Sequence, residues 1–398
     1  MMRKLFLCCF AIAFLCSCAQ EVQKEKIPFI FTPERKLMSI PVTIQGVAGN
    51  FLFDTGADFL CMDTIFATKI APYDSISDQF STYNKGAFFD DSSKFSINVY
   101  KGLLKVGIGN HCFEQKYFSV GEYCKGLILP EFDGLFGLEG FIDSPYVWEL
   151  NFEKNYINII ATDNFHLDGD FLTLPLKWDK GKTFTTLPIT IRIKQGVEVK
   201  SEKDFLIDTG SITDVLFIHD TEESQKLDTQ KDSAYWLPER HFWDAEMTVC
   251  NRVKLDAARV YVYDMSYTGA FKGILGLNFL KRFNVYFDLK NNQLYLKPIK
   301  TFERITQGKK PWGKFSSSQK NGKDIIDRIC DYKDNPAIKA GFQIGDEIIS
   351  INGKLNSEYS EEDWEKLSQE EIWNYVVKRD GKLLNLTLRR NLNKQIED

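Results

Sequence analysis

Histidine is scarce in this chain, and closely spaced metal-binding pairs are absent. There are 4 histidines in the whole sequence, and no Cys-x-x-Cys or His-x-x-x-His spacing occurs. Zinc sites in particular draw their ligands from such spacings. We therefore expect no metal site and no cofactor. The histidines are scattered at His111, His166, His219 and His241.

Several other classes of protein find no support in the composition. The net charge is -5 at pH 7 with both signs interspersed, and no basic stripe is present, so we expect no nucleic-acid partner. No block of proline, glycine or serine interrupts the chain, so most of it should fold. Neither a Gly-x-Ser-x-Gly motif nor a recognisable Cys/His signature occurs, which argues against a covalent serine or cysteine mechanism.

The N-terminus has the features of a secretory signal. Arg3 and Lys4 precede an apolar run over residues 5–15, which is too short to span a bilayer as a helix. The run ends in Leu-Cys-Ser-Cys, which resembles the cleavage box of bacterial lipoproteins and implies that Cys18 becomes the lipid-bearing first residue. An ordinary secretory signal with incidental cysteines is the alternative.

These features predict where the protein resides. A signal peptide over residues 1–17 and a polar tether over 18–34 place the mature protein in the cell envelope, held to a membrane by its lipid. Apart from the signal, no segment is long and apolar enough to cross a membrane. Ala19 follows Cys18 where an aspartate could stand, which in lipoproteins of double-membraned bacteria favours the outer membrane.

The cysteines after Cys18 are odd in number, so they cannot all pair within the chain. Cys112 and Cys124 could form a bridge, and buried free thiols are the alternative. The five positions are Cys61, Cys112, Cys124, Cys250 and Cys330.

One short motif occurs twice. Residues 51–57 read Phe-Leu-Phe-Asp-Thr-Gly-Ala, and residues 205–211 read Phe-Leu-Ile-Asp-Thr-Gly-Ser. The apolar run is typical of a strand buried on both faces, and the glycine lets the backbone turn sharply. A single copy fits a strand that ends in an Asx-type turn just as well. The second copy is what points to a function.

The match between the two copies extends to both sides. Upstream, residues 39–44 (Ser-Ile-Pro-Val-Thr-Ile) are echoed by residues 186–191 (Thr-Leu-Pro-Ile-Thr-Ile). Downstream, Gly-Leu-Phe-Gly-Leu at 134–138 is echoed by Gly-Ile-Leu-Gly-Leu at 273–277. Ordered correspondences of this kind indicate an internal duplication. A pair of strands with a turn is expected after each, over residues 147–159 and 284–296.

The order of apolar run, Asp-Thr-Gly and later apolar-apolar-Gly segment resembles the pepsin and retropepsin superfamily of aspartic proteases, in particular the bacterial retropepsin-like group. The resemblance covers residues 35–300. It implies a mainly β fold in which two retropepsin-like β-barrel lobes, over residues 35–165 and 166–300, form a pepsin-like pseudo-dimer in one chain. In that family the apolar-apolar-Gly segment crosses beneath the Asp-Thr-Gly loop and supports it.

The resemblance also implies an active site. Asp54 and Asp208 would form the catalytic pair. Two facing carboxylates cannot both ionise cheaply, so one keeps a proton over a broad pH range. The ionised aspartate would activate a water molecule to attack a peptide carbonyl, and the protonated one would stabilise the developing charge. The expected supporting residues of the two loops are Thr55, Gly56, Thr209, Gly210 and Ser211.

The two loops differ in the residue after the glycine, which is Ala57 in the first and Ser211 in the second. A hydroxyl at this position can donate to its carboxylate and lower the pKa of that group. We therefore predict that Asp208 acts as the base and Asp54 as the acid. The pair should titrate between the strongly acidic pepsin pattern and the milder retropepsin pattern.

An insertion separates each Asp-Thr-Gly loop from the later apolar segment. In the first lobe, residues 82–94 are where the family carries a flap that covers the substrate, and a surface hairpin is the alternative. A short helix is expected near residues 63–69. In the second lobe, residues 221–232 should be helical or irregular, and the aromatic residues over 235–243 are expected to pack in the core.

A third unit follows a basic linker over residues 301–311. Residues 335–353 hold Ala-Gly-Phe, then Gly-Asp, then a strand that ends in Asn-Gly, and this order resembles the PDZ family. The resemblance implies an α+β PDZ domain over residues 312–391. A capping-box pattern at residues 360–363 predicts the start of a helix.

PDZ domains hold the terminal carboxylate of a peptide on a Gly-x-Phe loop. Gly313 and Phe315 match that loop, and they imply a C-terminal peptide as a ligand. Lys314 replaces the small residue that is usual between them, so a packing module without a ligand is the alternative.

Two functions stay open at this stage. The first is a membrane-anchored aspartic endopeptidase that acts on peptide or protein substrates. The second is a catalytically inactive scaffold that holds peptides or partners at the membrane. An inactive relative is expected to have lost an aspartate or its glycine, whereas Asp54, Gly56, Asp208 and Gly210 are all present, which favours the enzyme. A homodimer that pairs like lobes from two chains is less economical.

Overall fold

The computed structural model of the chain is mainly β. The expected signal peptide, Cys18 and Gly313 lie outside the residues it describes. The tether expected over residues 18–34 is described over 25–32, and there the prediction was wrong: residues 27–28 and 30–31 pair as strands with later segments, and the apolar side chains of Ile27 and Phe29 are buried. The described residues are 25–32, 36–57, 60–70, 77–87, 90–122, 131–141, 144–179, 182–237, 240–263, 271–304, 315–320, 322–329, 335–368 and 370–389.

The first half contains a closed six-stranded barrel. Around the ring the strands are β3 (Met38–Ile44), β4 (Val47–Phe53), β9 (Gly134–Phe136), β5 (Leu60–Asp63), β8 (His111–Gly121) and β7 (Asp90–Ile108). A further pairing of β7 with β3 closes the ring. β2 (Ile30–Phe31) adds to the free side of β3.

The burial pattern explains why these segments are strands. In β3 the side chains of Ile40, Val42 and Ile44 point inward while Pro41 and Thr43 are exposed, which is the alternation of a strand with one wet face. β4 alternates at first and then ends in three buried residues before the Asp-Thr-Gly turn. β4 and β9 run parallel there, and β9 covers the end of β4.

The second half repeats the same pairings. Its strands follow the order β13 (Lys182–Thr186), β16 (Asp204–Asp208), β21 (Gly273–Gly276), β17 (Val215–Ile218), β20 (Val253–Tyr263), β19 (Arg240–Val249), β14 (Ile189–Ile193) and β15 (Glu198–Ser201). The parallel pair has the same register in both halves, with Leu52 opposite Leu135 and Leu206 opposite Ile274. The duplication in the sequence is therefore also a duplication of strand topology.

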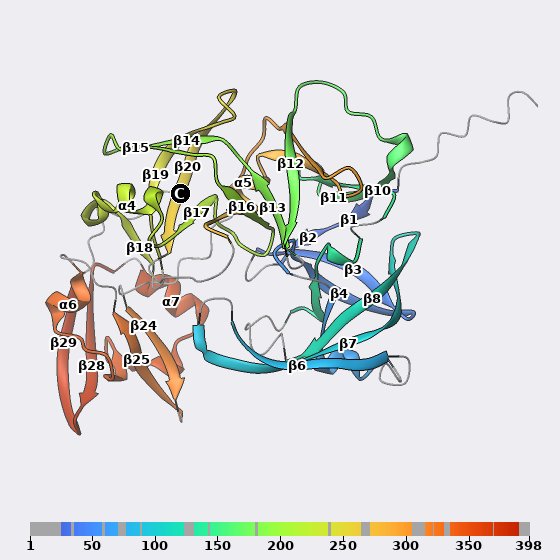
Figure 1. Ribbon diagram of the computed structural model, residues 1–398. Coiled ribbons are helices and arrows are strands. Elements are labelled where there is room, and N and C mark those ends of the chain that lie inside the picture. The colour runs from blue at the N-terminus through green and yellow to red at the C-terminus, as the bar shows by residue number, and fades with distance from the viewer. Residues whose placement is uncertain are drawn as a thin grey trace, which may run out of the picture.

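A shared antiparallel sheet joins the two halves (Figure 1). Its strands are β1 (Ile27–Pro28), β11 (Tyr156–Ala161), β10 (Tyr146–Asn151), β22 (Phe283–Asp288), β23 (Gln293–Pro298) and β12 (Leu172–Asp179). β10 and β22 pair across the junction, with Leu150 opposite Val285. The two strand pairs expected after the apolar-apolar-Gly segments are confirmed as β10–β11 and β22–β23.

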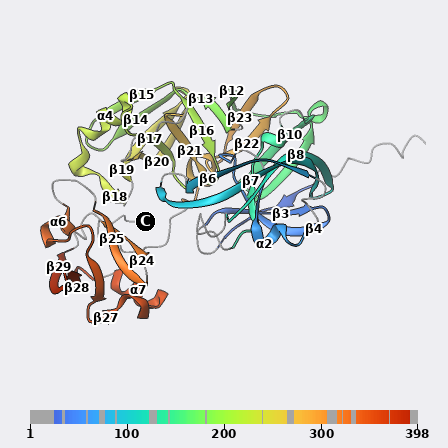
Figure 2. The same ribbon diagram turned by 60° about the horizontal axis from the view of Figure 1, so that its bottom comes forward.

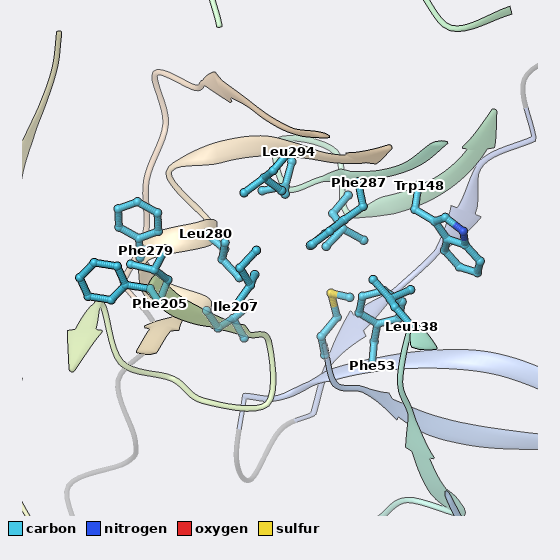
Figure 3. Packing of buried hydrophobic residues seen from close by; sticks show 14 of the residues in the cluster. Phe53, Leu138, Trp148, Phe205, Ile207, Phe279, Leu280, Phe287 and Leu294 are labelled. Carbon is cyan, nitrogen blue, oxygen red and sulfur yellow. The ribbon is translucent and has the colours of Figure 1, made fainter. Parts of the chain in front are cut away.

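One continuous apolar core runs from the first half into the second (Figure 3). Phe53 stacks on Phe136, and the buried indole of Trp148 lies beside both rings. On the other side of the junction the buried Ile207 and Phe287 belong to the same cluster. This packing holds the ends of β4 and β16 in fixed positions.

The halves differ in their hairpins. β6 (Ser77–Ala87) pairs with β7 to form a long curved hairpin that reaches out of the first half (Figure 2). Its counterpart in the second half pairs β19 with the much shorter β18 (Tyr235–Leu237). The hairpin expected around residues 82–94 is therefore present as backbone, with residues 88 and 89 outside the described chain.

Short helices fill the connections, and polar caps begin two of them. The Asp63 side chain accepts a hydrogen bond from the amide of Ile65 at the start of α2 (Thr64–Ala67), the helix expected near residues 63–69. Thr221 caps α4 (Glu222–Asp228) in the expected helical segment. The others are α5 (Leu277–Leu280), η2 (Glu139–Phe141), η3 (Thr162–Asn164) and η4 (Lys231–Ser233).

The C-terminal unit has its own sheet and its own apolar core. The sheet order is β24 (Phe315–Lys320), β25 (Lys323–Ile329), β26 (Glu347–Ile351), β28 (Ile372–Arg379) and β29 (Lys382–Arg389), with β27 (Lys354–Leu355) beside β26. The remaining elements are α6 (Pro336–Ala340), η5 (Asn356–Glu358) and α7 (Glu361–Ser368). The predicted capping box is confirmed, because Ser360 and Asp363 exchange side-chain to amide hydrogen bonds before α7.

Candidate active site

The two Asp-Thr-Gly turns lie at the ends of β4 and β16, where each is supported from behind. The amide of Asp54 donates to the carbonyl of Phe136 at the end of β9, with N and O 3.0 Å apart. In the second half Asp208 is paired with Gly276 at the end of β21. Each apolar-apolar-Gly segment therefore lies behind its own aspartate, as the repeat predicts.

The threonines of the two turns bond each other reciprocally. The Thr55 hydroxyl donates to the carbonyl of Ile207 at 2.7 Å and accepts from the amide of Thr209 at 3.1 Å. The Thr209 hydroxyl does the same in reverse, donating to the carbonyl of Phe53 at 2.6 Å and accepting from the amide of Thr55 at 3.1 Å. Because both side chains are buried, these bonds lock the halves together at this point.

The glycines bring the two carboxyl groups together. A Cβ added to Gly56 would lie 2.8 Å from Cγ of Asp208, and a Cβ added to Gly210 would lie 2.8 Å from Cγ of Asp54. Each glycine thus packs against the aspartate of the other half, and only a residue without a side chain fits there. The two carboxyl groups lie close enough for each to affect the pKa of the other.

The surroundings of the two aspartates differ. Burial raises the pKa of both, and for Asp208 the negative charge of Asp54 adds to this, so the pKa of Asp208 lies well above its usual value. Asp54 accepts two backbone amides, from Gly56 at 2.9 Å and Ala57 at 3.1 Å, which offset part of its burial. Asp208 accepts the Gly210 amide at 2.8 Å. Asp54 is therefore the group that ionises first, and Asp208 keeps the shared proton.

This order of ionisation is the reverse of the one predicted from the Ser211 hydroxyl. The Ser211 hydroxyl is hydrogen-bonded to the hydroxyl of Thr213 at 2.9 Å, and the expected bond to Asp208 is not formed. The reason for predicting Asp208 as the base, a hydrogen bond from Ser211, is therefore absent from the structure.

The new geometry changes what we expect from a Ser211→Ala variant. Because the hydroxyl does not contact Asp208, its removal should leave the pKa of that group, and so the basic limb of the pH–activity profile, in place. The profile of hydrolysis of an unstructured protein, measured for wild type and variant, is the check. A move of the basic limb to higher pH would show that the hydroxyl reaches the carboxylate after all.

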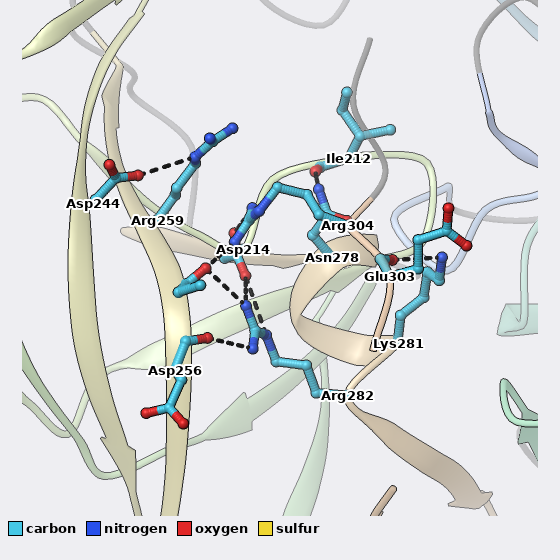
Figure 4. Close-up of polar contacts among 11 residues, drawn as sticks. Ile212, Asp214, Asp244, Asp256, Arg259, Asn278, Lys281, Arg282, Glu303 and Arg304 are labelled. Carbon is cyan, nitrogen blue, oxygen red and sulfur yellow. Dashed lines mark hydrogen bonds and ion pairs between the residues drawn. The ribbon is translucent and has the colours of Figure 1, made fainter. Parts of the chain in front are cut away.

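The second turn is anchored by a buried ion cluster that the sequence did not reveal (Figure 4). Asp214 is fully buried, and its carboxylate accepts from Nη2 of Arg282 at 3.1 Å and from Nη1 of Arg304. Burial lowers the pKa of Arg282, and the charge of Asp214 opposes that effect. The carbonyl of Asp214 also accepts the amide of Gly276 at 3.0 Å. The cluster therefore ties the far end of the Asp208 turn to β21 and to the chain that leaves the second half.

Of the two candidate peptide-binding residues in the C-terminal unit, Phe315 lies within the described residues and Gly313 does not. Phe315 is buried and stacks on Phe342 with ring centroids 4.9 Å apart, so its side chain belongs to the core. Its backbone begins β24, the edge strand of the sheet, and α7 lies beside β24 in both views (Figures 1 and 2). The buried carboxylate of Asp346, in the Gly-Asp motif, accepts from Nε of Arg379 at 2.6 Å.

The cysteines lie in different surroundings. Cys61 is buried, Cys112 and Cys250 are free thiols, and Cys124 and Cys330 lie outside the described residues. Within the described ranges, no three acidic, histidine or cysteine side chains gather in a metal-binding arrangement. No helix in that part of the chain is long and apolar enough to cross a membrane.

Neither a scan against protein-family models nor a search of curated proteins found a match.

Proposed function

We propose that this chain is an aspartic endopeptidase of the pepsin and retropepsin type, with both lobes in one chain. The observation that carries the proposal is the pair of neighbouring carboxyl groups, Asp54 and Asp208, each packed against the glycine of the opposite turn. Reciprocal threonine bonds and supporting strands surround the pair with the same pattern in both halves. Such a rigid, partly dry carboxyl pair is suited to acid–base catalysis at acidic pH.

The mechanism follows from the difference between the two groups. The ionised Asp54 takes a proton from a water molecule held between the carboxyls, and the water oxygen forms a bond to the peptide carbonyl carbon. The proton of Asp208 moves to the carbonyl oxygen, which gives a neutral tetrahedral diol. Asp54 then returns its proton to the leaving nitrogen, the C–N bond breaks, and Asp208 regains a proton from the diol.

The accessory parts are proposed from the same resemblance. We propose that the β6–β7 hairpin acts as the flap over a bound peptide. The C-terminal unit is proposed to be a PDZ domain that accepts an extended C-terminal peptide as an added strand on the free edge of β24. The lipoprotein signal and Cys18 lead us to place the mature enzyme in the cell envelope, anchored by its lipid.

The competing function is an inactive peptide-binding lipoprotein. The two are separated by incubating the purified full-length protein with an unstructured protein between acidic and neutral pH and sequencing the products by mass spectrometry. New peptide ends made by the wild type and not by an Asp208→Asn control support the peptidase. Binding of the intact peptide without new ends would support the scaffold.

Because both lobes belong to one chain and share a sheet, activity should not depend on assembly. We expect the rate per enzyme molecule to stay constant on dilution from about micromolar to nanomolar concentration, since no dimer dissociates. A fall in specific activity on dilution, reversed by concentrating the sample, would instead favour an active site built between two chains.

A further inference from the structure

A lysine from the second half reaches the first Asp-Thr-Gly turn. Lys182 begins β13, and its Nζ donates a hydrogen bond to the main-chain oxygen of Gly56 at 3.1 Å. The next residue, Thr183, is buried, and its hydroxyl donates to the main-chain oxygen of Thr55 at 2.9 Å. β13 therefore holds two consecutive carbonyl groups of the turn that carries Asp54.

The ammonium group of Lys182 also lies close to the carboxyl pair. Gly56, whose carbonyl it binds, donates its amide to Asp54 and packs against the carboxyl group of Asp208. The positive charge of Lys182 lowers the pKa of both aspartates and so opposes the larger effect of burial. The next acidic side chain along the second turn, Asp214, faces two arginines and is neutralised by them.

A lysine on the neighbouring strand forms an exposed ion pair, the more usual contact of a lysine side chain. Lys177 lies on β12, opposite Phe184 of β13, and forms an exposed ion pair with Asp204 at 2.8 Å. Such a pair contributes little and affects only its own surroundings. Lys182 instead directs its ammonium group to a carbonyl of the active-site turn.

We infer that Lys182 is a positioning residue of the proposed peptidase, which holds the Gly56 carbonyl in place and supplies a fixed positive charge beside the carboxyl pair. The inference rests on the proposed function. A positive charge favours the singly ionised pair over the fully protonated one, so it extends activity toward lower pH. The positive charge also makes the loss of the pair's last proton easier, so it moves the basic limb of the pH profile to lower pH as well.

Lys182→Met is the decisive variant, because methionine keeps the length of the side chain and loses its charge. Removal of the charge raises both pKa values, so both limbs of the pH–rate profile should move to higher pH by about 1 unit. On the acidic limb kcat should then fall about tenfold, with little change in KM. Lys182→Arg, which keeps the charge and the donors, should restore the profile. Lys177→Met should leave it unchanged.

A second readout needs no turnover. In full-length protein labelled at the aspartate carboxyl carbon with ¹³C, the resonances of Asp54 and Asp208 report the titration of the pair directly. The inference is overturned if Lys182→Met leaves both the profile and this titration where wild type and Lys177→Met have them. If no form cleaves peptide at any pH but the titration still moves, the proposed function fails while the charge effect of Lys182 stands.

Discussion

Asp54→Asn and Asp208→Asn should each abolish peptide hydrolysis, with a fall in kcat of at least about 10²–10⁴-fold, the range supplied by acid–base groups. Asn at position 54 cannot accept the proton of the water molecule, and Asn at position 208 cannot give one to the carbonyl oxygen. Either change removes the single proton that the pair shares. Kinetics on an unstructured protein substrate, at several pH values, measures the loss. Full activity in either variant would rule out the paired mechanism.

The thermal stability of Asp208→Asn shows whether its loss of activity comes from the carboxyl pair itself and not from unfolding. The pKa of Asp208 in the folded protein is raised well above 3.8, its ordinary value, so the folded state holds its proton more tightly than the unfolded state does. The stabilisation from this proton is complete below the ordinary pKa and is lost as the pH rises through the folded one. The asparagine variant avoids that loss. It should unfold at a higher temperature than wild type at pH 7 and at a similar temperature at pH 3.

Asp204 provides a matched control, because its pKa is lowered where that of Asp208 is raised. Its burial would raise its pKa, but hydrogen bonds from Lys177 and Thr186 outweigh burial and lower it. Asp204→Asn should therefore lose a little stability at pH 7 and keep its activity. Two aspartate variants that shift thermal stability in the same direction at pH 7 would contradict this account of the pair.

Asp214→Ala should destabilise the protein by about 3–5 kcal/mol, because it leaves the positive charge of Arg282 buried without its carboxylate counter-ion. Urea unfolding followed by tryptophan fluorescence measures the effect. The control is Asp244→Ala, whose partner Arg259 lies in a less buried ion pair at 3.2 Å (Figure 4). That change should cost about 1 kcal/mol or less.

The same cluster offers a test of the cause. Combining Asp214→Leu with Arg282→Met removes the uncompensated charge of Arg282. The double variant should therefore recover much of the stability that Asp214→Ala loses. If Asp214→Ala cost no more than Asp244→Ala, the cluster would not anchor the turn. If the double replacement were as unstable as the single one, the harm would come from lost packing and not from the buried charge.

What could be predicted from the sequence was local or repeated. The strands around both Asp-Thr-Gly turns and the hairpins after the apolar-apolar-Gly segments depend on neighbouring residues, and the repeat showed each of them twice. The capping box at residues 360–363 is local as well. The contacts that were missed join distant positions. Arg282 and Arg304 are 68 and 90 residues from Asp214, and Lys182 is 126 residues from Gly56. No local pattern marks such pairs.

The hydrogen bond expected from Ser211 to Asp208 was missed for another reason. The prediction counted the hydroxyl of Ser211 as a partner of Asp208 because of its position in the motif. In the structure that hydroxyl is hydrogen-bonded to Thr213. A short motif shows which groups are near one another but not which of several hydrogen bonds will form.

The shared sheet has a consequence for how the chain is made. Glu149 of β10 pairs with Tyr286 of β22, 137 residues later. A ribosome that has finished the first barrel and β10 has therefore not yet produced β22, the strand that pairs with the outer edge of β10. Until that strand arrives, β10 presents unpaired amides and carbonyls on which another chain could add a strand. Synthesis arrested before residue 283 should thus yield a fragment that aggregates, and nascent chains of this protein should need protection by chaperones until their second half emerges.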